Sequence, residues 1–132
     1  MIYMLDTNIC SYIIRNHPVH IKEKLKQISK ENTVALSSIV VSELFYGAYK
    51  KDSKKLINLI ELFVDSFEIY EFGIDAAKEY GILRPDLEKQ GLPIGAYDLQ
   101  IAAHAISLDA ILVTNNEKEF GRIKRLKVEN WV

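Results

Sequence analysis

Short apolar runs of strand length alternate with segments of helical length along the whole chain. The first run spans Ile2 to Leu5, a helix is expected from Thr7 to Ile14, and the next apolar run spans Thr33 to Leu36. Strands that alternate with helices pair in parallel, because each helical crossover returns the chain to the same edge of the sheet. We therefore expect an α/β fold of three layers, in which a mostly parallel central sheet of four to five strands is flanked by helices.

The same patterns assign the rest of the chain. The further strands expected are 67–72, 110–113 and about 127–132. Two further helices are expected to begin at Pro18 and at Asp52 or Ser53. Three more are expected over 39–49, 75–89 and 98–108, with a helical turn near 117–120. The chain has 132 residues and contains no repeat or linker, so we expect a single domain, 1–132.

The formal net charge is only −1, so the chain as a whole does not attract nucleic acid or an anionic membrane. Its basic residues nevertheless gather in three segments, which are either solvated faces or local phosphate-binding patches. These are Lys22, Lys24, Lys26 and Lys30; Lys50, Lys51, Lys54 and Lys55; and Arg122, Lys124, Arg125 and Lys127.

Three features favour a cytoplasmic protein that does not associate with membranes. No apolar run reaches the roughly 20 residues of a membrane-spanning helix. Asp6 interrupts the start of the chain where a signal peptide would be apolar. Cys10 is the only cysteine, so no internal disulfide can form. We expect Cys10 to pack as a small apolar residue near the first strand.

Three acidic side chains lie in apolar surroundings. Asp6 follows the first strand directly, Glu43 interrupts the apolar stretch 39–45, and Asp98 opens the helix expected at 98–108. Each has an ordinary explanation by itself, as a helix cap, an exposed side chain or a first-turn residue. Burial of a carboxylate costs several kcal/mol unless a cation or hydrogen-bond donors offset it. Three such positions together therefore indicate one shared partner.

The predicted topology brings oxygen-bearing side chains to one edge of the sheet. Asp6 follows one strand, Thr114 to Asn116 follow another, and Ser37 and Ser38 follow a third and lead into the helix that carries Glu43. Ligand sets made only of oxygen select hard ions such as Mg²⁺ or Mn²⁺. Such an ion assists hydrolysis of phosphodiesters, because it makes water a better nucleophile and stabilises charge on the phosphoryl group.

Four segments, in this order, resemble the PIN domain and, more narrowly, the VapC-type toxins of bacterial toxin–antitoxin pairs. They are Met4-Leu5-Asp6-Thr7-Asn8, the helix with Ser38, Glu43, Leu44 and Gly47, the entry Pro93-Ile94-Gly95-Ala96-Tyr97-Asp98, and Leu112-Val113-Thr114-Asn115-Asn116 followed by Glu119-Phe120. The resemblance covers essentially the whole chain. It implies an endoribonuclease that depends on Mg²⁺ or Mn²⁺, forms a homodimer and is held inactive by a cognate VapB antitoxin. Enteric members of the family cut initiator transfer RNA, which makes transfer RNA a candidate substrate.

The resemblance also implies residue roles. Asp6, Glu43 and Asp98 would bind the metal, and Thr7 and Thr114 would orient them by hydrogen bonds. At the family's fourth acidic position this chain has Asn116, which carries no charge. Glu119, about one turn later, is the other candidate for this catalytic position. The number of metal ions, one or two, stays open.

Two other functions fit parts of the pattern. A phosphotransferase of the haloacid dehalogenase type also has an Asp after its first strand, but Asp6-Thr7-Asn8 lacks the second acid and no catalytic lysine can be placed. A catalytically silent PIN-like module that binds RNA or protein is the main alternative, because Asn116 replaces an acid.

Other conspicuous residues have structural explanations. His17, His20 and His104 do not have the spacing of a zinc site, and we expect no metal-binding role for them. The aromatic residues Phe45, Tyr46, Tyr49 and Phe63 are expected in the core or at a dimer interface rather than stacked on bases.

Overall fold

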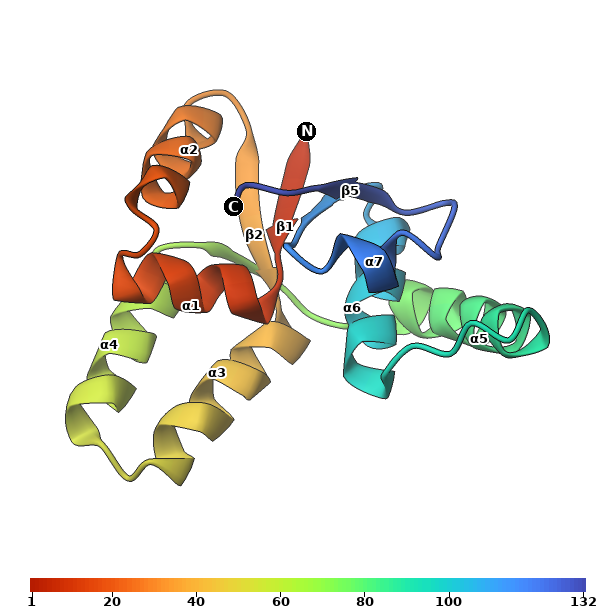
Figure 1. Ribbon diagram of the computed structural model, residues 1–132. Helices are drawn as coiled ribbons and strands as arrows, with labels where there is room; N and C mark the ends of the chain where they lie inside the picture. The colour runs from red at the N-terminus through yellow and green to blue at the C-terminus, as the bar shows by residue number, and fades with distance from the viewer.

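The computed structural model describes all residues, 1–132, and contains one five-stranded sheet covered by helices (Figure 1). The strands are β1 (Ile2–Leu5), β2 (Thr33–Ser37), β3 (Glu68–Tyr70), β4 (Ile111–Val113) and β5 (Lys127–Glu129). Their order is β3-β2-β1-β4-β5, and every neighbouring pair is parallel. The predicted α/β fold is confirmed, with a sheet that is wholly rather than mostly parallel.

Seven helices connect the strands, close to the segments that the sequence predicts. They are α1 (Thr7–Arg15), α2 (Val19–Ser29), α3 (Ser38–Lys50), α4 (Lys54–Asp65), α5 (Ile74–Lys89), α6 (Ala96–Ser107) and α7 (Glu117–Phe120). In Figure 1, α1 to α4 lie on one side of β1 and β2, and α5 to α7 lie on the other. None of the helices is long and apolar enough to cross a membrane.

The strand order creates a switch point between β1 and β4. The chain builds the sheet outward from β1 through β2 to β3, and then returns to place β4 on the other side of β1. Loops that leave the two strands at such a point diverge, and the carboxyl ends of the strands border a crevice where ligands bind in open parallel sheets. Asp6 and Thr114 directly follow β1 and β4 and so lie at this switch point.

Helix starts follow the capping signals in the sequence. The side chain of Asp6 accepts a hydrogen bond from the Ile9 amide at 2.9 Å and caps α1. Ser37 caps α3 in the same way through the Ile39 amide at 3.1 Å. The predicted start of α6 was wrong by two residues, because the helix begins at Ala96 and not at Asp98. Asp98 therefore lies inside the first turn of α6 instead of opening the helix.

The core surrounds β1, β4 and α6. Met4, Leu5, Leu112 and Val113 are completely buried. Helix α6 is buried along most of its length, through Leu99, Ile101, Ala102, Ala103, His104 and Ala105. A helix packed this closely has little freedom to shift. The core thus fixes the position of Asp98 in the first turn of α6.

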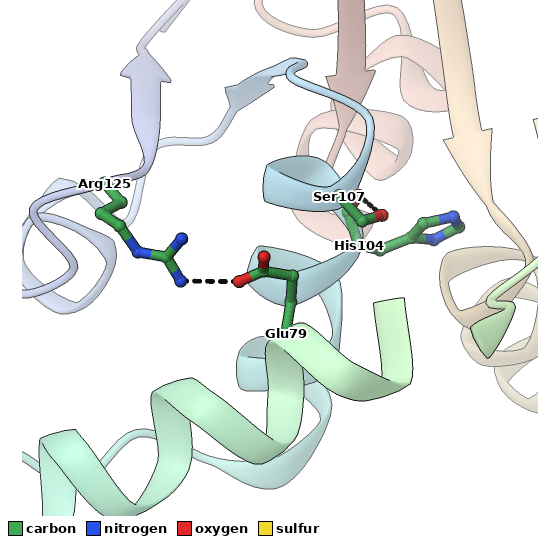
Figure 2. A network of polar contacts seen from close by, with 4 residues as sticks. All are labelled: Glu79, His104, Ser107 and Arg125. Atoms are coloured by element: carbon green, nitrogen blue, oxygen red, sulfur yellow. Dashed lines mark hydrogen bonds and ion pairs between the residues drawn. The ribbon is translucent and has the colours of Figure 1, made fainter. Parts of the chain in front are cut away.

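Buried His104 joins α6 to β2. Its Nδ1 lies 2.7 Å from the Ser37 hydroxyl, and Figure 2 shows the ring pointing away from α6 toward β2. Burial lowers the pKa of His104, so the neutral ring is favoured. Ser107 contacts the backbone carbonyl of His104, at 2.7 Å, and not its ring. This histidine is a structural residue.

Two expectations about single residues are resolved by burial. Cys10 is completely buried, as predicted. Phe45 and Phe63 pack against the core, but Tyr46 and Tyr49 are 66% and 61% exposed and do not belong to it. For these two tyrosines the expected place in the core is wrong, and a place at a dimer interface stays a prediction.

Candidate active site

Asp6 and Thr114 meet across the switch point. The Asp6 amide donates to the Val113 carbonyl at 3.0 Å and so extends the pairing of β1 with β4 by one residue. The Thr114 hydroxyl donates a short hydrogen bond to Oδ2 of Asp6, while Oδ1 accepts from the Ile9 amide. Asp6 is only 5% exposed. Its carboxylate is therefore held on both oxygens by neighbours from two different elements.

Glu43 and Thr7 contribute polar atoms that have no partner. Glu43 lies on α3 and is half-buried, and Thr7 is the first residue of α1. Oε1 of Glu43 and the hydroxyl of Thr7 are buried without any hydrogen bond. Such atoms are rare in folded proteins, because each loses its hydration without compensation. The Thr7 hydroxyl lies near enough to lower the pKa of Glu43, but no hydrogen bond of ordinary length joins the two side chains.

Asp98 faces the same negative charges. Burial raises the pKa of Asp98 to about 6, and the negative charges of Glu119, Glu43 and Asp6 add to the effect in that order. A carboxylate is affected in this way only when the other acids lie near it. The four acids, one directly after β1 and the others on α3, α6 and α7, therefore form one electrostatic cluster.

Glu119 is held in the cluster by a chain of hydrogen bonds that starts at Thr114. The Thr114 hydroxyl accepts from the Asn116 amide at 3.0 Å, and the Asn116 side chain donates to Oε2 of Glu119 at 3.0 Å. Oε1 of Glu119 accepts from the Gly95 amide at 3.2 Å, just before α6. Asn116 is thus turned toward Glu119. Of the other acids, Glu119 raises the pKa of Asp98 most.

The cluster contains negative charge and no matching positive charge. Burial raises the pKa of Asp6, and it also raises the pKa of Glu43, which the charge of Asp6 raises further. The ion pairs of the protein lie elsewhere and join Arg84 to Glu88, Arg125 to Glu79 and Lys127 to Asp109. A cation in the cluster would relieve this repulsion.

The acidic side chains are not arranged around one metal position. No three acidic, histidine or cysteine side chains converge closely enough to enclose one ion. An ion held by Asp6, Glu43 and Asp98 would therefore require some of these side chains to turn toward it. The side chain of Asp6 is held by its hydrogen bonds, so the turn would fall to the side chains of Glu43 and Asp98, whose backbone positions the helices set.

A groove of about 380 Å³ extends from one side of the cluster, between α1, α3 and α4. Thr7 and Glu43 line its inner end, whereas Asp6, Asp98, Asn116 and Glu119 lie outside it. The sequence pattern did not reveal this groove. Its walls come from three helices whose contacts are long-range, and the only signal in the sequence was the small size of Ser11, Gly47 and Ala48.

Comparisons with known proteins agree with this architecture. A profile of the PIN domain family matches residues 3–126. The chain is 49% identical over 132 residues to ribonuclease VapC2 of Rickettsia felis, covering 99% of this chain and 98% of the relative. It is 38% identical over 130 residues to the tRNA(fMet)-specific endonuclease VapC of Shigella flexneri, covering 98% and 97%.

The structural match is equally extensive. A crystal structure of VapBC2 from Rickettsia felis, bound to a DNA fragment from their promoter, contains a chain that superposes on this one with a TM-score of 0.94. The two are 47% identical, and the match covers 100% of both chains.

Proposed function

Because this chain belongs to the PIN domain family and is a VapC-type ribonuclease toxin, we propose that its acidic cluster is a metal-dependent catalytic centre that cuts RNA internally. The resemblance and the enzyme class expected from the sequence are confirmed. The observation that carries the proposal is that Glu119, Glu43 and Asp6 all raise the pKa of Asp98, while no ion pair of the protein involves any of these acids.

The donor set fits Mg²⁺ or Mn²⁺. All of its groups are oxygen donors, and two of the buried oxygen atoms, in Thr7 and Glu43, lack any hydrogen bond. In this proposal Asp6, Glu43 and Asp98 hold the metal. A bound ion supplies positive charge that stabilises the phosphoryl group and makes water more acidic.

The protein's own residues orient the carboxylates. Thr114 holds Asp6 in one orientation, and Asn116 and the Gly95 amide hold Glu119. We assign the fourth acidic position to Glu119 and a positioning role to Asn116, because of these two residues only Glu119 carries a charge that acts on Asp98. Thr7 lies next to the cluster with a free hydroxyl, and it would hydrogen-bond to whatever binds there.

Transfer RNA is the proposed substrate. The support is the 38% identity to a relative named as a tRNA(fMet)-specific endonuclease, over nearly the full length of both chains. An enzyme with this substrate would act in the cytoplasm.

Partner chains are proposed on two grounds. The structural relative from Rickettsia felis is a VapBC2 assembly, so we propose that this chain binds a cognate VapB-type antitoxin. We also propose that it forms a homodimer, because large apolar side chains stay exposed on helices: Tyr46, Tyr49, Leu59, Leu62, Ile74, Ile82 and Tyr97. Light scattering of the purified chain, alone and with the antitoxin, tests both assemblies.

The function is tested by inducing the wild type and Asp98→Asn side by side in bacteria. We expect growth arrest and a discrete new RNA fragment only with the wild type. The purified enzyme should cut total transfer RNA with Mg²⁺ or Mn²⁺ and not with EDTA. Binding of RNA without any turnover would instead support a catalytically silent module.

A further inference from the structure

The groove between α1, α3 and α4 connects the acidic cluster with two unpaired cations. Its inner end is lined by Thr7 and Glu43. Its α1 wall ends at Arg15, the last residue of that helix, and its α3 wall ends at Lys51, which caps the other helix. Both helices begin at the carboxyl edge of the sheet and run away from it (Figure 1).

Both walls place their lining residues one helical turn apart. These residues are Thr7, Ser11 and Arg15 on one wall, and Glu43, Gly47 and Lys51 on the other. Residues four apart share a face of a helix, and eight residues span about 12 Å along its axis. Each cation therefore lies about two turns from the acidic cluster. At that distance it can bind a phosphate other than the one being cut.

Arg15 and Lys51 are free to bind an anion. Neither takes part in any of the three ion pairs of the protein. The guanidinium of Arg15 lies 5.3 Å from the centre of the Tyr12 ring, and its Nε donates to the Ser11 carbonyl at 3.3 Å. These contacts restrain the side chain and leave its terminal nitrogens without a partner.

The basic segment near the C-terminus, unlike Arg15 and Lys51, has most of its cations paired inside the protein. Arg125 is paired with Glu79 at 2.6 Å, as Figure 2 shows, and Lys127 with Asp109 at 2.9 Å. Arg122 donates to the Pro93 carbonyl at 2.8 Å. Three of its four cations are thus used inside the protein. The three basic segments that the sequence presents as equivalent are therefore not equivalent in the structure.

Gly47 keeps the middle of the groove open. Glycine inside a helix costs about 1 kcal/mol relative to alanine. A Cβ atom at Gly47 would meet no atom within 4 Å, so no neighbour inside the protein requires glycine here. Glycine stands at position 47 although the packing of the protein does not require so small a residue. A small residue is expected where a ligand passes close to the helix.

We propose that the groove binds the RNA strand on one side of the cleaved bond. Arg15 and Lys51 bind phosphates of that strand, and Gly47 leaves room for it. The two unpaired cations beside an acidic centre favour a polyanion over a polypeptide segment, whereas Ile14, Leu44, Leu56 and Ile60 in the same walls offer apolar contacts. This proposal rests on the proposed ribonuclease function and assigns the substrate path at that same centre.

The first test measures RNA binding by the full chain in EDTA, using a short fluorescein-labelled single-stranded RNA and fluorescence anisotropy. Arg15→Gln/Lys51→Gln should weaken binding about tenfold and make the slope of log K against log salt shallower by about 1.4, since a single strand gives about 0.7 per phosphate contact. The control Lys22→Gln/Lys26→Gln removes two charges from α2, which lies toward the opposite end of the strands (Figure 1). Equal effects in both double variants, or none in the first, would overturn the proposal.

A second test fills the groove without changing charge. Gly47→Ala and Gly47→Gln should keep or raise the melting temperature, because both residues favour the helix. RNA affinity should fall with Gln and change little with Ala. Unchanged RNA affinity of Gly47→Gln would overturn the proposal and leave the groove to another occupant, such as a segment of the antitoxin.

Wild-type cleavage separates this proposal from the function on which it rests. If the wild type cuts RNA with Mn²⁺ while the groove variants bind RNA normally, the groove assignment is wrong and the ribonuclease stands. If the wild type neither binds nor cuts RNA, the proposed catalytic centre and the groove assignment both fail.

Discussion

Thr114 donates its hydroxyl hydrogen to Oδ2 of Asp6 across the boundary between β1 and β4. The same hydroxyl accepts a hydrogen bond from the Asn116 amide, and Asn116 in turn holds Glu119. One side chain therefore connects the most buried acid of the cluster with the acid on α7. This connection makes Thr114 the residue on which the shape of the cluster depends.

Thr114→Val keeps the volume of the side chain and removes its hydroxyl. We expect a loss of about 10- to 100-fold in Mn²⁺ affinity or cleavage rate, as is typical when a group that orients a metal ligand is removed. Calorimetric titration with Mn²⁺ and a cleavage assay measure this. Thr33→Val is the control, because Thr33 at the start of β2 lies away from the acids. Equal activity of Thr114→Val and the wild type would contradict the role of Thr114.

Asp98 should make the metal-free protein more stable in acid. Its pKa is about 6 in the folded protein and 3.8 as the ordinary value, so between these values the folded state binds more protons. This contribution to stability is fully present below the ordinary pKa and is lost as pH rises through about 6. Melting temperatures in EDTA should therefore rise from pH 7.5 to pH 5 more in the wild type than in Asp98→Asn.

The comparison isolates one residue, because the other titrating groups are present in both proteins. At pH 7.5 Asp98→Asn should be more stable than the wild type and inactive in cleavage, since it removes repulsion and a metal-binding charge together. Parallel pH profiles of the two proteins would show that Asp98 does not titrate as described.

Glu119 and Asn116 should differ in their effect on cleavage. Glu119→Gln removes the charge that acts most strongly on Asp98, and we expect at least a tenfold loss of cleavage together with a lower pKa of Asp98. Asn116→Ala removes one hydrogen bond to Glu119, worth about 1 kcal/mol, and should cost about fivefold. A larger loss with Asn116→Ala than with Glu119→Gln would reverse the assignment of the fourth position.

His104 should matter for stability and not for catalysis. His104→Ala leaves a cavity and deprives the Ser37 hydroxyl of a partner, so we expect a loss of about 2 kcal/mol in the free energy of unfolding. Urea unfolding and Mn²⁺ titration measure the two properties separately. His17→Ala, at an exposed histidine, is the control. Weakened Mn²⁺ affinity in folded His104→Ala would contradict a purely structural role.

Much of the fold could be predicted from local patterns. Strand β1 and helix α7 have the predicted bounds, and the side chains of Asp6, Ser37 and Ser53 cap α1, α3 and α4, because capping needs only a side chain and the amides that follow it. The start of α6 was misplaced because Gly95 and Ala96 carry no strong capping signal, and Gly95 has no side chain with which to cap.

The amino-acid sequence by itself determined the alternation of strands and helices, the family and the acids Asp6, Glu43 and Asp98, since each depends on residue type and spacing. Only the tertiary structure turned the Asn116 side chain toward Glu119, paired one basic segment with carboxylates and opened the groove beside Gly47. Those features arise from contacts between elements far apart in the chain. Such contacts depend on how helices pack across the sheet, and no local pattern encodes them.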